Sequence, residues 1–90
     1  MDLNTAARVR IMPDGVETDL ESIQEKLKKL AIEYGKLEAS EVKPIAFGLS
    51  AIEAMILLED NAGGMDELVE KIKDVDGVAD IELLDVSRLI

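Results

Sequence analysis

The sequence contains no cysteine and no histidine, and its only aromatic residues are Tyr34 and Phe47. Without cysteine or histidine the chain cannot form disulfide bonds, cysteine-based zinc sites, cysteine nucleophiles or histidine-based triads. Two rings are also too few for the aromatic platform on which single-stranded nucleic acids stack. Most common hydrolytic mechanisms and one common mode of RNA binding are therefore excluded.

Positive charge is scarce as well, since 20 acidic residues against 10 basic residues leave a formal net charge of −10. A chain of this charge repels the phosphate backbone that supplies most of the affinity for nucleic acids. No apolar run approaches the roughly 20 residues that span a bilayer, and the N-terminal stretch lacks the apolar centre of a signal peptide. We expect a cytoplasmic protein that binds neither nucleic acid directly nor a membrane.

The residues that are present are typical of one small folded domain. Hydrophobic residues make up 48% of the 90 positions and charged residues 33%, a composition far from that of disordered chains. A chain of this length has room for one modest core. We expect residues 1–90 to form a single domain that folds alone as a monomer.

The N-terminal part predicts a strand followed by a helix. Residues 7–11 alternate between apolar side chains and arginines, the period of a half-buried strand, which ends at the Pro-Asp-Gly turn signal at 13–15. Thr18 stands three residues before Glu21, the spacing of a capping box. The apolar residues that share one face of the helix are Leu20, Ile23, Leu27, Leu30, Ala31 and Tyr34. Gly35 is expected to end this helix.

The middle of the chain predicts a hairpin. Residues 36–43 are polar and lack a clear period, which fits either a loop or the frayed start of an edge strand. Pro44 suits an edge because it has no N–H to donate to a ladder. The apolar run 44–60 is too long for one strand, and the small residues at 48–51 indicate a tight reversal. We expect the second arm of the hairpin at about residues 52–59.

The second arm of this hairpin has apolar residues on both of its faces. The residues expected to face the helices are Ile52, Ala54, Ile56 and Leu58. The residues expected on the uncovered face are Glu53, Met55, Leu57 and Glu59. Met55 and Leu57 are either ordinary residues of a central strand or part of a partner or dimer surface, and the sequence leaves both alternatives open.

The C-terminal part predicts a second helix and a last strand. Residues 61–64 are expected to form a turn, after which apolar residues recur at helical spacing. These residues are Met65, Leu68, Val69, Ile72 and Val75. Asp76 and Gly77 break the helix, and alternation at 79–83 predicts a short final strand.

The order strand, helix, strand, strand, helix, strand predicts an α+β fold. Two split units of this kind form the ferredoxin-like βαββαβ sandwich, a four-stranded antiparallel sheet with two helices on one face. The first and third strands then lie in the centre of the sheet. The expected core packs Ile23, Leu27, Leu30, Leu68 and Ile72 against Val9, Ile11, Ile56 and Leu58.

No stretch of the chain carries a catalytic or ligand-binding motif. Carboxylates are so numerous that pairs such as Asp14 with Glu17 arise by chance, and no phosphate-binding pattern is present. We therefore expect no enzyme, no cofactor and no metal site. Phe47 stands apart, because it lies beside the hairpin turn between Ala46 and Gly48. Its ring either points outward to a partner or folds inward as a strand residue.

Several stretches in a fixed order resemble one family. The opening "ARVRIMPDGVETDLE", the hairpin "KPIAFGL" with "LLED" after it, then "GGMDELVEKI" and "VDGVADIELLDVSRLI" resemble archaeal elongation factor 1-beta over essentially the whole chain. That family is similar to the C-terminal exchange domain of the eukaryotic factors, the guanine nucleotide exchange factor for the GTPase elongation factor 1-alpha. The resemblance implies a ferredoxin-like fold, no cofactor, and promotion of GDP release and GTP rebinding on elongation factor 1-alpha.

The resemblance also implies which residues contact the GTPase. In the eukaryotic relatives the aromatic residue of this hairpin inserts into a pocket on the GTPase, which identifies Phe47, with Ala46 and Gly48 beside it, as partner-binding. A lysine near the C-terminus of those relatives reaches towards the magnesium site, whereas this chain has Leu89 there and Arg88 one place earlier. We assign Arg88 part of that role. Two lysines that often follow the hairpin glycine in those relatives are missing from this chain.

Two other classes of protein share this fold. A small regulatory or ligand-binding module would bind a metabolite at strand or subunit edges and dimerise through its open sheet face. An acylphosphatase-like enzyme would need an arginine-bearing phosphate loop after the first strand, and "PDGVETD" contains no arginine. Because fold alone does not imply function, the exchange factor is the leading hypothesis and the regulatory module is the alternative.

Overall fold

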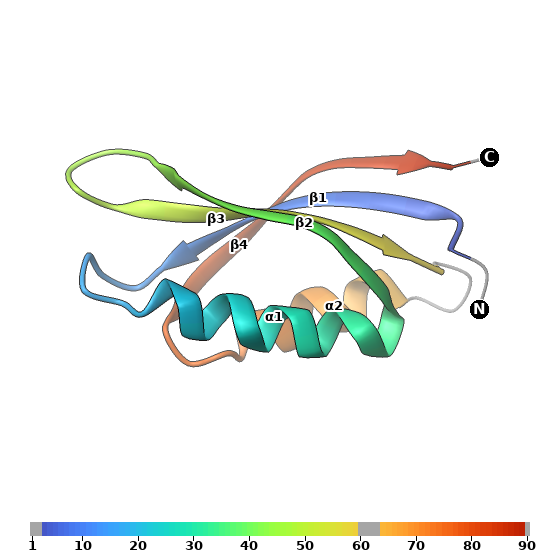
Figure 1. Cartoon of the computed structure of the whole chain (residues 1–90), viewed down its shortest axis with the longest axis horizontal. Coiled ribbons are helices and arrows are strands. Elements are labelled where there is room, and N and C mark those ends of the chain that lie inside the picture. The colour runs from blue at the N-terminus through green and yellow to red at the C-terminus, as the bar shows by residue number, and fades with distance from the viewer. Residues whose placement is uncertain (1–2, 60–63, 90) are drawn as a thin grey trace.

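The computed structural model describes residues 3–59 and 64–89, which form one antiparallel sheet with two helices on one of its faces (Figure 1). The elements are β1 (Thr5–Pro13), α1 (Leu20–Tyr34), β2 (Gly35–Pro44), β3 (Ser50–Leu58), α2 (Gly64–Lys73) and β4 (Val78–Arg88). The strand order β2-β3-β1-β4 puts β1 and β3 in the centre. The predicted ferredoxin-like α+β fold is confirmed. The turn predicted at 61–64 lies outside the described residues except for its last residue, which begins α2.

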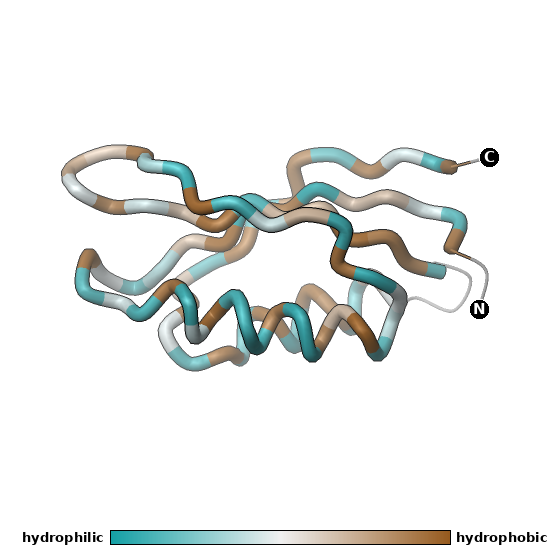
Figure 2. The backbone as a smooth tube through the Cα atoms, in the orientation of Figure 1, coloured by the Kyte–Doolittle hydropathy of each residue, from teal (hydrophilic) through white to brown (hydrophobic). Residues whose placement is uncertain are grey.

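The core lies between the two helices and the two central strands. Val9 pairs with Ala54 and Ile11 with Ile52 across the β1–β3 ladder, and all four side chains are buried. Hydrophilic and hydrophobic residues alternate along α1, whose apolar side supplies the opposite wall (Figure 2). Every predicted core residue packs here, with Leu30 only partly buried. Each fully buried aliphatic side chain contributes about 1.5 to 3 kcal/mol.

Asp19, and not the predicted Thr18, caps the start of α1. The Asp19 carboxylate accepts a hydrogen bond from a backbone N–H of the first turn at 3.2 Å, whereas the Thr18 hydroxyl donates to Asp14 at 2.6 Å. A carboxylate also interacts favourably with the positive end of the helix dipole. At the other end Gly35 terminates the helix as predicted. A Cβ at Gly35 would overlap the Leu57 carbonyl oxygen, so the chain can pass directly from helix to strand only with glycine.

Of the two structures left open for residues 36–43, the edge strand is correct. β2 starts immediately after α1 and pairs with β3 as far as Pro44, which lies opposite Ser50. The hairpin turn therefore covers residues 45–49 and comes earlier than the predicted 48–51. Polar residues are tolerated along β2 because most of its side chains are exposed at the edge of the sheet.

β4 is the longest strand, with 11 residues, and the prediction of a short final strand was wrong. Its pairing with β1 shifts register twice, once between Arg8 and Val9 and again between Met12 and Pro13. Such bulges break the period of two, so the apolar residues of β4 do not mark one face. Leu83 pairs with Val9 yet remains 49% exposed at this outer edge.

The molecule is elongated, with extents of 39 × 20 × 17 Å. The β2–β3 turn and the β1–α1 loop lie at one end of the long axis, and β4 ends at the other (Figure 1). Within the two described ranges, neither helix is long and apolar enough to cross a membrane.

Candidate partner-binding site

The turn between β2 and β3 is closed by its own backbone. The Ile45 N–H donates to the Leu49 carbonyl oxygen, and the Leu49 N–H donates to the Ala46 carbonyl oxygen, both at 2.9 Å. Phe47 and Gly48, the two residues inside, have φ angles of 53° and 79°. Two successive positive φ angles are typical of the primed turns that match the twist of a hairpin. No side chain is needed to hold this turn.

Phe47 combines an unfavourable backbone conformation with an unfavourable environment. It is the only residue other than glycine with a positive φ in the described part of the chain, a conformation that costs about 1 to 2 kcal/mol for a residue with a Cβ. The ring is 99% exposed, so no burial within the chain offsets this cost. Of the two orientations that the sequence left open, the outward one is present.

Two further apolar residues lie at the same end of the molecule. Val16, from the β1–α1 loop, is 64% exposed, and its Cγ1 lies 3.9 Å from the position that a Cβ of Gly48 would occupy. Ile45, at the start of the turn, is 40% exposed. We call Val16, Ile45 and Phe47 the apolar tip. Sequence reasoning missed Val16, because nothing in the sequence indicates that the β1–α1 loop lies next to the hairpin.

Of the four residues predicted to bind a partner, Ala46, Phe47 and Gly48 are adjacent, and Arg88 is remote from them. Arg88 ends β4, where it pairs with Thr5 near the opposite end of the long axis (Figure 1). Its side chain is exposed and forms no ion pair with any residue in the described ranges. One partner that contacts both Phe47 and Arg88 must therefore extend along most of the molecule.

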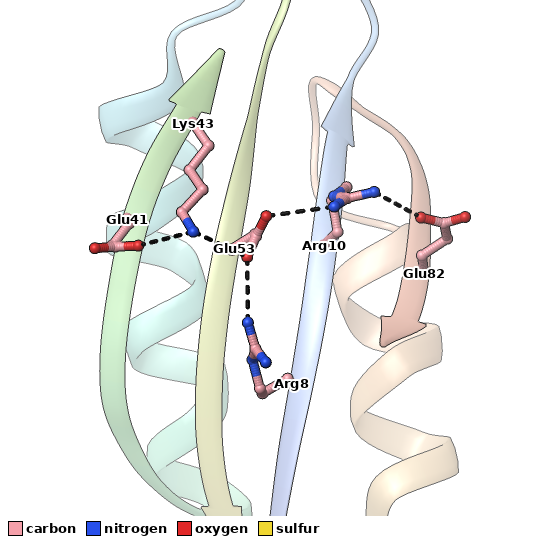
Figure 3. A network of polar contacts seen from close by, with 6 residues as sticks. All are labelled: Arg8, Arg10, Glu41, Lys43, Glu53 and Glu82. Carbon is pink, nitrogen blue, oxygen red and sulfur yellow. Dashed lines mark hydrogen bonds and ion pairs between the residues drawn. The ribbon is translucent and has the colours of Figure 1, made fainter. Parts of the chain in front are cut away.

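A charged cluster crosses the sheet face that the helices leave open (Figure 3). Its members are Arg8, Arg10, Glu41, Lys43, Glu53 and Glu82, and we call them the Glu53 cluster. Four of them form one row of directly paired residues, with Glu41 on β2, Glu53 on β3, Arg10 on β1 and Glu82 on β4. Ion pairs with N–O distances of 3.4 to 3.6 Å connect the six side chains.

The positive and negative side chains of the Glu53 cluster neutralise one another. Glu41 and Glu53 lie directly opposite each other, an arrangement that is normally repulsive, but Lys43 lies 3.5 Å from both carboxylates. The Glu53 side chain is only 16% exposed. Partial burial acts to raise the pKa of Glu53, but Lys43 and then Arg10 outweigh it, and the pKa lies below its ordinary value of 4.5. Glu53 therefore stays ionised and holds three cations together.

The open face offers little apolar surface at the positions where the sequence suggested a partner or dimer contact. Met55 and Leu57 do lie on this face, as predicted, but both are partly buried. The most exposed large apolar side chains in the described residues are instead Phe47 and Val16, at the apolar tip, with Ile32 on α1. This distribution favours the tip over the open face as a contact surface.

Solved structures share the fold at low sequence identity. The ACT domain from GTP pyrophosphokinase of Chlorobium tepidum is similar with a TM-score of 0.63 and 18% identity, covering 90% of this chain and 99% of that one. The C-terminal domain of the MgtC protein from Mycobacterium tuberculosis gives a TM-score of 0.60 and 12% identity, covering 98% and 90% of the two chains. At these identities the similarity concerns the architecture alone.

Proteins related by sequence identify the family more specifically than the solved structures do. Elongation factor 1-beta of Pyrococcus furiosus is 39% identical over 89 residues, covering 98% of each chain. Elongation factor 1-beta of Archaeoglobus fulgidus is 37% identical over 82 residues, covering 91% of this chain and 93% of the relative. The EF-1 guanine nucleotide exchange domain matches residues 6–89, from the first strand to the residue after β4. The chain therefore belongs to the elongation factor 1-beta family of guanine nucleotide exchange factors in translation.

Proposed function

We propose that this protein is the guanine nucleotide exchange factor for elongation factor 1-alpha, and that it promotes GDP release and GTP rebinding on that GTPase. The observation that carries the proposal is Phe47, a strained aromatic residue with a 99% exposed ring in a chain of the exchange family. A large apolar side chain in this state contributes nothing to the fold. Insertion into a pocket of the GTPase would supply the burial that the free protein lacks.

Exchange of this kind requires no catalytic side chain. GTPases of this class hold GDP through backbone groups, a lysine and magnesium around the phosphates. A partner that binds the nucleotide-free GTPase more tightly must weaken GDP binding by the same factor, because the two equilibria are linked. No covalent bond is made or broken, so the protein acts as a binding partner and not as an enzyme.

Arg88 is proposed as a second, weaker contact. It lies at the far end of the long axis from Phe47, and its guanidinium has no ion-pair partner in the described ranges. A partner lying along the 39 Å axis would reach both residues. In this arrangement Phe47 anchors one part of the GTPase while Arg88 interacts with another. Arg88 takes over part of the role of the C-terminal lysine of the eukaryotic relatives.

The exchange factor is proposed to act as a monomer in the cytoplasm, where translation elongation takes place. The alternative, a regulatory module that dimerises through its open sheet face, has less support. That face is occupied by the Glu53 cluster, whose charges already compensate one another, and its apolar residues Met55 and Leu57 are partly buried.

The direct test is release of labelled GDP from the elongation factor 1-alpha of the same organism. Catalytic amounts of this protein should accelerate release in the presence of excess unlabelled nucleotide, with an equal amount of an unrelated acidic protein as the control. Unchanged release at stoichiometric amounts would refute the proposed function. Sedimentation at micromolar concentration should report the mass of one chain, and twice that mass would favour the regulatory alternative.

A further inference from the structure

A groove with an accessible volume of about 370 Å³ runs between α1 and α2. Its lining residues are Lys26, Lys29, Leu30, Lys71, Asp74 and Val75, and we call it the lysine groove. Leu30 and Val75 are partly buried and pack against the core, so they provide an apolar floor. Three lysines against a single aspartate then make the lining basic, in a chain whose net charge is −10.

Within the described residues, two of the three lysines of this groove lack the ion-pair partners that the cations of the Glu53 cluster have. Lys26 and Lys29 form no ion pair with any residue that the structure describes, whereas every cation of the Glu53 cluster has a carboxylate partner. Lys71 lies 3.1 Å from Glu33 and 5.3 Å from the centroid of the Tyr34 ring. The Tyr34 side chain and then the Glu33 carboxylate keep the pKa of Lys71 above its ordinary value. The Lys71 ammonium group is therefore charged at neutral pH.

We propose that the lysine groove binds an acidic amphipathic helix of a partner protein, whose apolar side chains lie on Leu30 and Val75 and whose carboxylates pair with Lys26 and Lys29. A helix laid in a groove needs apolar contacts at its centre and complementary charges along its sides. The groove offers both. The groove is open to the surface, unlike the enclosed pockets that hold metabolites.

The net charge of the chain restricts this binding to the groove. Electrostatic interactions between exposed groups are screened beyond about 8 to 10 Å at physiological salt, so carboxylates far from the groove contribute little to its charge. The three lysines of the lining outnumber Asp74 together with Glu33, the carboxylate paired with Lys71. Elsewhere the acidic surface repels an acidic segment, and the same repulsion acts against a nucleic acid as the occupant. No lining residue belongs to the apolar tip or to the Glu53 cluster. The proposal therefore does not rest on nucleotide exchange.

The probe is a synthetic helical peptide with leucines along one side and glutamates flanking them, labelled for fluorescence anisotropy. Two peptides serve as controls, one with every leucine replaced by serine and one with the same residues in scrambled order. The full-length protein should bind the designed peptide more tightly than either control. Binding should weaken with added salt but not vanish, because part of the free energy comes from apolar contact. If the serine peptide binds as tightly as the designed peptide, the groove acts through positive charge alone and the proposal is overturned. An absence of binding to the designed peptide would also overturn it.

The variant Lys26→Glu/Lys29→Glu should weaken binding of the designed peptide by about tenfold or more, since each lost exposed pair is worth up to about 1 kcal/mol and becomes repulsive on charge reversal. A matched control is Lys28→Glu/Lys73→Glu, which changes the net charge equally at two exposed lysines outside the groove. Equal losses in the two variants would overturn the proposal, because only net charge would then matter.

Both variants should keep the thermal stability of the parent and full exchange on elongation factor 1-alpha. Loss of exchange in the groove variant alone would place the groove in the GTPase interface instead and overturn the proposal.

Discussion

Phe47 of the apolar tip and Glu53 of the Glu53 cluster lie on the same β2–β3 hairpin, but their surroundings are opposite. At the tip, Phe47 is 99% exposed in a strained turn, and no residue in the described ranges covers its ring. In the cluster, Glu53 is 16% exposed and lies within ion-pair distance of three cations. The ion pairs of Glu53 form within the chain, so folding alone accounts for the cluster. The described residues leave the Phe47 ring uncovered, so the tip indicates contact with a second molecule.

Side-chain burial and backbone strain therefore distinguish a structural charged network from a partner-binding surface better than the presence of charged residues does. Ion pairs on an exposed face contribute little each, but a network around one carboxylate is sensitive to loss of its centre. An exposed aromatic residue contributes nothing until a partner covers it. Mutations should accordingly affect stability at the cluster and exchange at the tip.

Phe47→Ala should produce the largest effect and should act on exchange alone. Truncation of an aromatic anchor costs roughly 2 kcal/mol or more, about a thirtyfold fall in the rate of GDP release at subsaturating concentrations. The melting temperature should stay nearly constant, because the ring buries nothing in the free protein. Labelled-GDP release and thermal unfolding are measured on the same preparation. A loss of about 3 kcal/mol or more of folding stability would indicate a core residue and contradict the assignment.

Val16→Ala should lower exchange by about fivefold, the equivalent of roughly 1 kcal/mol for a residue beside an anchor. Val42→Ala provides the matched control, because Val42 is 46% exposed on β2 and lies outside the tip. Exchange assays on the two variants should differ clearly while their unfolding curves coincide. Identical exchange rates would restrict the contact to the hairpin turn and exclude the β1–α1 loop.

Phe47→Gly removes the backbone strain at position 47 together with the ring, whereas Phe47→Ala removes the ring and keeps the strain. Glycine adopts positive φ without a steric cost, so this variant should be more stable than Phe47→Ala by roughly 0.5 to 1 kcal/mol. Both variants should lose exchange to the same extent, since neither has a ring. Urea unfolding measures the difference in stability. A glycine variant that is the less stable of the two would mean that the turn carries no strain at this position.

Glu53→Gln should lower the melting temperature by a few degrees at neutral pH and leave exchange per folded molecule unchanged. The pKa of Glu53 is depressed in the folded protein, so its contribution is fully present above the unfolded value of 4.5 and is lost as pH falls through the lower folded value. The difference in melting temperature between parent and variant should shrink with falling pH in that window. A difference that does not change with pH would rule out the ionised carboxylate as its origin.

Arg88→Ala should have the smallest effect, a fall in exchange of about 1.4-fold to fivefold at low salt that corresponds to about 0.2 to 1 kcal/mol for an exposed charge. Added salt should reduce the difference from the parent, since exposed charges are screened. Lys73→Ala removes an exposed cation elsewhere and controls for net charge. Exchange rates equal to those of the parent at all salt concentrations would remove Arg88 from the interface.

The predictions from sequence succeeded where one face of an element is buried and failed at the edges of the sheet. β1 and β3 alternate because β1 packs its odd-numbered residues and β3 its even-numbered residues against the helices. β2 is exposed on most positions, and bulges interrupt β4, so neither strand keeps a period that marks its extent. The prediction of Thr18 as the helix cap was wrong, because spacing alone does not indicate that the Thr18 hydroxyl donates its hydrogen bond to Asp14.

The amino-acid sequence by itself determined the element order, the central pair of strands, the core, and Phe47 as the unusual residue, because these follow from local periodicity and composition. Only the tertiary structure decided that Glu41, Glu53, Arg10 and Glu82 form one row, since that depends on the register of three strand pairs. It also brought Val16 beside the hairpin turn and assembled the lysine groove from two helices. Contacts between segments far apart in sequence depend on how the elements pack, and no local pattern in the sequence encodes that packing.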